Sequence, residues 1–374
     1  MKHSNALRTA VIVMLAGVLA SCARPGPGVL KPVGTTVPGA TTTRVYVATT
    51  RMRKVIDENV YSRGFSRQVN YGQFTISVPP GHKVGDIEWP IGAPDPAVSF
   101  ATLEQGVLTR DGFAARVAED SARKLHVGVF VHGFNTNFQE ALYRVAQLKA
   151  DSEVDGVPVL FAWPSEARVT GYIADKDAVT YSRDQLVDLL RMLAHDNRVA
   201  GITVFAHSMG GWLTVEALRQ LRLMGDNATI ARLAGVILAA PDIDVDVFRR
   251  QMEVVGSLSP PLTVLVSRDD LALTVSSRLA GERPRLGALD VNDERVQEIA
   301  LKAKIEIIDI SNLGAPDLLR HDRYARLASI YPRLTADDHD MRHTGAFVLD
   351  SMGATLAAPF SMTGKMIAGG SDGE

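Results

Sequence analysis

A serine between a predicted strand and a predicted helix is the strongest chemical motif of the sequence. Residues 202–206 (ITVFA) predict a buried strand and residues 212–224 predict a helix, with Ser208 in the turn between them. This is the strand–turn–helix context of a nucleophile elbow, with Ala206 in place of the first glycine of G-x-S-x-G. Such a turn strains the serine backbone, so the residues two positions away must be small, as Ala206 and Gly210 are. Because the following helix points its free N–H groups at the turn, the spacing predicts Ser208 as a nucleophile.

Other segments, read together with this motif, resemble a known family. They are 71–80 (YGQFTISVPP), 132–135 (HGFN), 161–165 (FAWPS), 206–210 (AHSMG) and 239–244 (AAPDID). Over about residues 45–335 they resemble an uncharacterised bacterial family of the α/β-hydrolase superfamily, usually described as esterase/lipase-like. The resemblance implies a serine hydrolase with a Ser-Asp-His triad, while leaving the natural substrate and its acyl-chain length open.

The resemblance also implies where an oxyanion would bind. Residues 127–131 predict a buried strand that runs into His132-Gly133-Phe134, which is similar to the His-Gly-x loop of esterases and lipases. Carried over to this chain, the oxyanion donors are the backbone N–H groups of Phe134 and Met209. We expect His132 to hold the loop rather than to act as a base.

Several aspartates compete for the acid of the triad, which in this superfamily follows the serine and precedes the histidine. The predicted strand 262–266 leads into Asp269 and Asp270, and the segment 270–273 (DLAL) resembles the family pattern, so we prefer Asp270 to Asp269. Asp242 and Asp244 remain alternatives, although Asp244 precedes a predicted helix that its carboxylate could cap.

Three histidines follow Asp270 and could serve as the base: His321, His339 and His343. His321 comes after the last predicted core strand, and the segment 321–324 (HDRY) resembles the family signature, so we assign the base to His321. His339 and His343 lie in Asp-rich, polar surroundings. We expect His207, next to the nucleophile, to point away from it.

Apolar runs that alternate with amphipathic stretches must position these residues. Residues 45–49, 74–78, 127–131, 159–162, 202–206, 236–239, 262–266 and 305–308 predict strands. Continuous Val/Ile/Leu runs separated by helical patterns are typical of a parallel sheet covered on both faces. We therefore expect one mostly parallel, doubly wound α/β domain over residues 45–356, which the resemblance implies to have the α/β-hydrolase fold. The pattern is weaker at 281–304, and we expect a flexible tail at 357–374.

The start of the chain reads as a targeting signal. Lys2 and Arg8 precede an apolar run over residues 10–20, which is shorter than the about 20 residues that span a bilayer. The run ends at Cys22, in a context that resembles the lipobox of bacterial lipoproteins. We therefore expect a signal peptide at 1–21, lipidation of Cys22 and a flexible Pro/Gly/Thr-rich linker at 22–44. Ala23 after the cysteine favours the outer membrane, with the domain facing the periplasm.

Composition excludes other classes of protein. The chain of 374 residues has 40 Lys and Arg against 42 Asp and Glu, so no basic surface predicts nucleic-acid binding. One cysteine permits no intramolecular disulfide or thiolate metal cluster, and we expect no metal or organic cofactor. The expected partners are a small-molecule or lipid acyl ester and the membrane, while the oligomeric state stays open. A serine peptidase or amidase, and a non-catalytic envelope lipoprotein, are the alternative functions.

Overall fold

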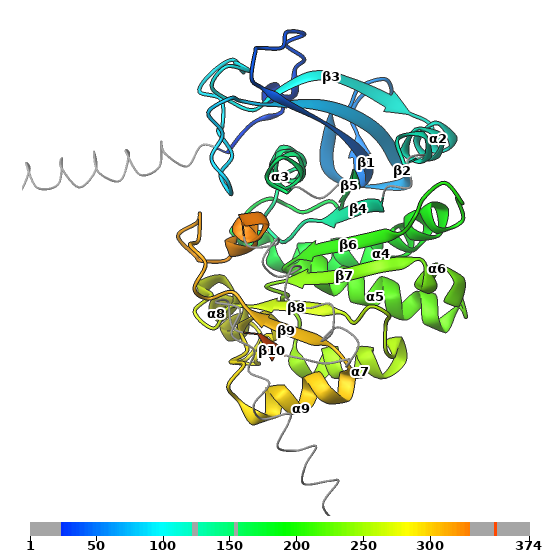
Figure 1. The fold of residues 1–374 in the computed structure, drawn as a ribbon, viewed down its shortest axis with the longest axis vertical. Helices are drawn as coiled ribbons and strands as arrows, with labels where there is room; N and C mark the ends of the chain where they lie inside the picture. Colours follow the sequence, from blue (N-terminus) through cyan, green and yellow to red (C-terminus); the bar gives the residue numbers. More distant parts are fainter. Residues whose placement is uncertain (1–23, 122–125, 153–155, 330–347, 350–374) are drawn as a thin grey trace, which may run out of the picture.

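The computed structural model describes residues 24–121, 126–152, 156–329 and 348–349. In these residues ten strands form one sheet in the order β10-β9-β8-β7-β6-β4-β5-β1-β2-β3 (Figure 1). The strands are β1 (Thr41–Arg53), β2 (Tyr61–Val78), β3 (Ala101–Leu108), β4 (His126–Val131), β5 (Gly156–Ala162), β6 (Ile202–His207), β7 (Leu233–Ala239), β8 (Thr263–Val266), β9 (Glu306–Asp309) and β10 (Val348–Leu349).

The sheet is mostly parallel, as the sequence predicts. All neighbours from β10 to β1 pair in parallel, whereas β1 with β2 and β2 with β3 pair antiparallel. The central strands are buried on both faces, which explains their continuous apolar runs. The carboxyl ends of the parallel strands meet at one edge, where the loops that carry the candidate site residues also lie.

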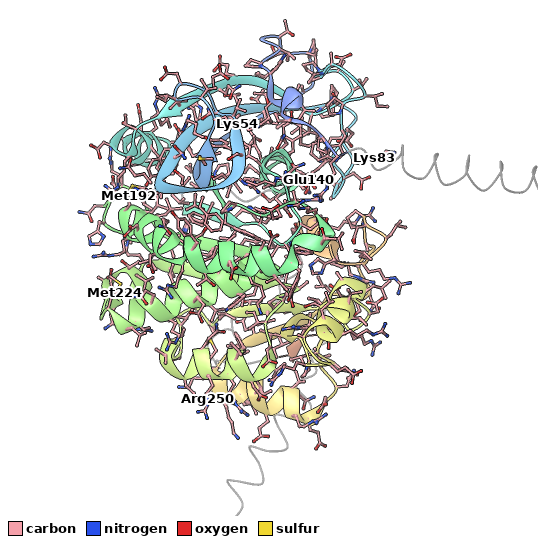
Figure 2. The ribbon with its side chains drawn as sticks, turned by 180° about the vertical axis from the view of Figure 1, so that it is seen from behind. Lys54, Lys83, Glu140, Met192, Met224 and Arg250 are labelled. Atoms are coloured by element: carbon pink, nitrogen blue, oxygen red, sulfur yellow. The ribbon has the colours of Figure 1, made fainter. Side chains whose placement is uncertain are left out.

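Helices cover both faces of the sheet. One face packs against α2 (Arg110–Asp120), α4 (Tyr172–Ala194), α5 (Met209–Leu223), α7 (Val245–Val255) and α9 (Glu294–Ala303), of which α4 and α5 lie in front in Figure 2. The other face packs against α3 (Phe138–Asp151) and the 3₁₀ helix η4 (Arg323–Ser329). Shorter elements complete the described chain: α6 (Asn227–Ala231), α8 (Leu271–Leu279), η1 (Pro27–Leu30), η2 (Val169–Gly171) and η3 (Leu286–Ala288). None of the described helices is long and apolar enough to cross a membrane.

The expectation of a flexible linker up to residue 44 is wrong from Arg24 onward. Strand β1 already begins at Thr41, and the segment before it packs against the domain. Tyr143 Oη donates to the Val29 carbonyl at 2.8 Å, and the Val33 N–H donates to the Thr102 carbonyl at 2.9 Å. Leu30 is buried in the core beside α3. A Pro/Gly-rich segment has few hydrogen bonds of its own, but here the folded domain supplies the partners.

Some expectations fall outside the described residues. The signal peptide 1–21, Cys22, His339, His343 and the tail 357–374 are among them. Within the described part, the weak pattern at 281–304 contains η3 and α9.

Candidate active site

The turn at Ser208 joins β6 directly to α5. Ser208 has φ 53° and ψ −121°, a left-handed backbone conformation that costs energy in a residue with a side chain. A Cβ at Gly210 would lie 2.4 Å from the carbonyl oxygen of His132, so only glycine fits there. Ser208 makes no side-chain hydrogen bond to cap α5, so its hydroxyl does not occupy the first amides of the helix.

The His132 loop lies against this turn. A Cβ at Gly133 would lie 2.9 Å from the Cβ of Ser208, so glycine permits the close approach. The ring nitrogens of His132 lie 2.9 Å from the Gly133 carbonyl and 3.0 Å from the Trp163 carbonyl, and the ring stacks on Trp163. Burial, followed by the charge of Arg51, lowers the pKa of His132 to about 3. Neutral His132 therefore holds the loop that carries Phe134 next to Ser208.

Asp270 and His321 lie 51 residues apart in the chain and are in contact. His321 Nδ1 lies 2.6 Å from Asp270 Oδ2, and the Asp270 side chain is fully buried. The other carboxylate oxygen accepts the Leu273 N–H at 2.9 Å and so caps α8. Burial lowers the pKa of His321, but the Asp270 carboxylate outweighs it and raises that pKa to about 9.

The alternative aspartates make other contacts. Asp269 pairs with Arg320 at 2.9 Å and with Arg323 at 2.7 Å. Asp242 accepts hydrogen bonds from Ser276 Oγ at 2.6 Å and Tyr172 Oη at 3.0 Å. It also lies 3.3 Å from Arg285 Nε.

Asp244 caps α7 by accepting the N–H groups of Asp246 and Val247. Among the described residues, Asp270 is thus the candidate acid whose carboxylate contacts a candidate base.

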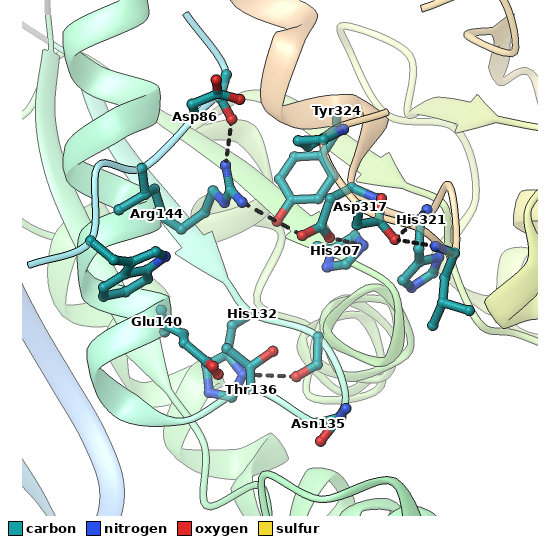
Figure 3. Close-up of a pocket in the computed structure, with 18 of the residues that line it drawn as sticks. Asp86, His132, Asn135, Thr136, Glu140, Arg144, His207, Asp317, His321 and Tyr324 are labelled. Carbon is teal, nitrogen blue, oxygen red and sulfur yellow. Dashed lines mark hydrogen bonds and ion pairs between the residues drawn. The ribbon is translucent and has the colours of Figure 1, made fainter. Parts of the chain in front are cut away.

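The structure places His207 beside the candidate base and in the lining of the site. Its ring centroid lies 4.5 Å from that of His321 and 4.3 Å from that of Tyr324 (Figure 3). Burial, followed by the positive charge of His321, lowers the pKa of His207 well below its ordinary value. A neutral His207 therefore packs against the His321 ring. His207 is the last residue of β6 and directly precedes Ser208 in the chain. The strained turn changes the direction of the chain between these two residues.

A buried carboxylate that the sequence analysis missed supports the loop of Phe134. Asp175, in the first turn of α4, accepts the Asn135 N–H at 3.2 Å and the Ser165 hydroxyl at 2.6 Å. It also accepts the Glu166 N–H at 2.6 Å. Burial raises the pKa of Asp175, although these donors oppose the shift. Nothing local in the sequence marks Asp175, because its partners lie 9 to 40 residues away.

A cavity of about 670 Å³ opens beside these residues. Gly133, Phe134, His207 and His321 line it, and Figure 3 shows the His132 loop across from His207 and His321. Ser208 is 3% exposed and lies next to Gly133, which lines the cavity. Charged side chains are frequent in the rest of the lining: Arg24, Lys83, Asp86, Glu88, Glu140, Arg144, Asp317 and Asp322.

The described residues show no group of three or more His, Cys, Asp or Glu side chains that could hold a metal ion. The groups that the site brings together are a serine hydroxyl, a carboxylate-bound imidazole and backbone amides.

Comparison with known proteins identifies the family. A family model described as an alpha/beta hydrolase of unknown function (DUF900) matches residues 109–337. The chain belongs to this family. It is therefore an α/β hydrolase, and its mostly parallel sheet with the elbow after β6 confirms the predicted fold class. No curated protein sequence matches this hydrolase.

Solved esterases are similar to this hydrolase over much of their length, at low identity. An inhibited esterase B from Lactobacillus rhamnosis is 10% identical to this chain, with a TM-score of 0.36. The match covers 88% of this chain and 95% of the esterase. An esterase from Pyrobaculum calidifontis is 13% identical, with a TM-score of 0.29. This match covers 80% of the present chain and 75% of the esterase. A lipase-esterase related protein from Clostridium acetobutylicum is 12% identical, with a TM-score of 0.26. Here the match covers 66% of the present chain and 95% of the Clostridium protein.

Proposed function

We propose that this protein is a serine hydrolase that cleaves carboxylic esters through an acyl-enzyme. His321 takes the hydroxyl proton of Ser208 as the oxygen attacks the ester carbonyl, and then gives the proton to the departing alcohol. Asp270 orients the ring and stabilises the imidazolium. The amides of Phe134 and Met209 stabilise the oxyanion, each by about 2.7–4 kcal/mol of barrier. Water then attacks the acyl-enzyme with His321 again as the base.

The contact between His321 and Asp270, beside the strained turn of Ser208, supports this proposal most strongly. A 2.6 Å contact between a buried carboxylate and Nδ1 orients the imidazole and leaves Nε2 for the nucleophile. The charged cavity lining favours esters with polar or small groups near the carbonyl.

The leaving group is not chosen by the triad, so peptidase or amidase activity is the alternative. We expect the full chain to hydrolyse short-chain p-nitrophenyl esters faster than the matching p-nitroanilides. A fluorophosphonate probe should label one site, which peptide mass spectrometry should locate at Ser208. Faster anilide cleavage would favour the amidase. No turnover and no labelling would favour the non-catalytic envelope lipoprotein.

The rate should depend on the protonation of His321. Only the neutral ring accepts a proton, and the pKa of His321 is raised to about 9. We therefore expect kcat/KM on a soluble ester to rise about tenfold per pH unit below that pKa and to level off above it. A rate profile corrected for chemical hydrolysis tests this, and a plateau already reached near neutral pH would contradict it.

The folding stability should depend on the same histidine. Because the pKa of His321 is raised on folding, its stabilisation of the fold is present below its unfolded pKa of about 6.5. That stabilisation is lost as the pH rises through about 9.

Asp175 should act as a positioning residue. Asp175→Asn keeps the volume of the side chain but replaces an acceptor of the loop amides with a donor, so the loop of Phe134 shifts. Because small displacements of catalytic groups cost up to about 10²-fold, we expect a loss of kcat of that order with KM little changed. Asp177→Asn, at an exposed position of the same helix, is the matched control. Equal kcat in the two variants would refute the positioning role.

We further propose that Cys22 anchors the protein by a lipid to the periplasmic side of a bacterial membrane, preferably the outer membrane. The order of the basic segment, the apolar run and the cysteine supports this. Cys22→Ser should abolish acylation and membrane retention while leaving kcat on a soluble ester unchanged. Mass spectrometry of the N-terminal peptide measures the acylation, and a free Cys22 thiol in the isolated wild-type protein would contradict the proposal.

A further inference from the structure

Exposed apolar side chains form a rim around the candidate active site. On α8, Leu271, Val275 and Leu279 are exposed and follow one another at intervals of four residues, so they share one face of the helix. Leu318, 96% exposed, adjoins them, because the Leu271 N–H donates to the carbonyl of Leu319 at 3.0 Å. We call the following set the apolar rim: Val169, Ile173, Leu271, Val275, Leu279 and Leu318.

The members of the apolar rim come together at one edge of the fold. They follow the carboxyl ends of β5, β8 and β9, and α8 lies at the left of Figure 1, where the central strands end. Tyr172, next to Ile173, contacts Ser276 of α8 at 3.0 Å, which joins the two parts of the rim. Contiguous exposed apolar side chains of this kind mark interaction surfaces.

The apolar rim also adjoins the candidate catalytic residues. Asp270 directly precedes Leu271 in the chain, and His321 follows Leu318 by three positions. A surface bound to the rim would therefore lie next to the loops that hold the acid and the base.

The N-terminal segment indicates which surface this is. The guanidinium of Arg24 donates to the carbonyls of Ala167 and Asn135, and it pairs with Glu140 at 3.2 Å. Ala167 lies two residues before Val169 of the rim. Cys22 precedes Arg24 by two residues, and two residues of extended chain span at most about 7 Å. A lipid on Cys22 would therefore enter the bilayer beside the apolar rim.

Charges on the rim are compatible with an anionic lipid surface. Over segments 268–283 and 311–320 the exposed charged residues are Arg268, Arg278, Arg283, Arg320 and Glu282. Two of the arginines pair with aspartates, Arg283 with Asp244 and Arg320 with Asp269. The net positive charge is thus modest, and the apolar side chains dominate.

We infer that the apolar rim docks onto the phospholipid bilayer to which the chain is anchored, so that the active-site edge faces the lipid. An apolar patch adds to the membrane affinity of a lipid anchor, because it buries further apolar surface in the bilayer. The inference rests on the proposed anchoring near Arg24. It does not depend on the proposed ester hydrolysis.

A fluorescent label that reports contact with lipid tests the docking. The acylated full chain with Val275→Cys carries one free thiol, because the sulfur of Cys22 bears the lipid, and an environment-sensitive dye is attached to that thiol. In vesicles of phosphatidylethanolamine and phosphatidylglycerol, we expect its emission to rise severalfold and to be quenched by nitroxide-labelled acyl chains. A label at Ile173→Cys should respond in the same way.

The matched control is Met224→Cys, at the far end of α5, on the side of Figure 2 opposite α8. Met224 and Val275 are equally exposed, at 48% and 49%, so only their positions differ. If labels at 275 and 224 are equally accessible to aqueous iodide in the presence of vesicles, the docking is refuted. In a Ser208→Ala background the label at 275 should respond to vesicles as it does in the active protein. This separates the test of docking from that of catalysis.

Discussion

Ser208→Ala should lower kcat for ester hydrolysis by about 10⁶-fold, the loss seen when the nucleophile of a serine triad is removed. Alanine keeps the Cβ that packs against Gly133 and tolerates the turn as well as serine does, so the fold should persist. The variant should also lose all labelling by a fluorophosphonate. Steady-state kinetics and gel fluorescence measure the two effects.

Ser257→Ala, at an exposed serine in the loop after α7, is the control for this substitution. It should retain wild-type turnover and labelling. Labelling that persists in Ser208→Ala would remove Ser208 as the nucleophile, whatever the remaining activity. Equal turnover in wild type and Ser208→Ala, on esters and on amides, would remove the hydrolytic mechanism itself.

Asp270→Asn should lower kcat by about 10⁴-fold, because the amide no longer holds His321 in the tautomer that presents a free Nε2. The Leu273 N–H can still be capped by the amide oxygen, so α8 should keep its first turn. The substitution also removes the charge that raises the pKa of His321. The remaining activity should therefore reach its plateau at lower pH than in the wild type. A pH–rate profile of the variant measures both effects.

Asp269→Asn tests which of the two adjacent aspartates, Asp269 or Asp270, is the acid of the triad. Asp269 binds Arg320 and Arg323, so its replacement should reduce stability modestly and leave kcat within a fewfold of wild type. If Asp269→Asn lost more activity than Asp270→Asn, the acid would be assigned to Asp269. Asp242→Asn extends the comparison to the alternative acid after β7.

The local order of residues was sufficient to predict the elbow and the class of fold. The strand, the turn and the helix around Ser208 are contiguous, and the small residues that the turn requires stand two positions on either side. Apolar runs for the strands β4 to β9 likewise predicted the parallel part of the sheet. Strand β3 was missed, because its Glu104, Gln105 and Gly106 interrupt the apolar pattern.

Contacts between distant residues were decided only by the tertiary structure. Asp269 and Asp270 have nearly the same neighbours in sequence, and the direction of each side chain determines which one meets His321, 51 residues later. The role of Asp175 depends on amides up to 40 residues away. The composition of residues 22–44 predicted a flexible linker, yet Arg24 within it reaches Asn135 and Ala167, more than 100 residues along the chain. Sequence alone therefore determined which groups could react, because the turn that exposes Ser208 is encoded by adjacent residues. The fold decided which of them meet, because hydrogen bonds and packing join segments that the sequence keeps apart.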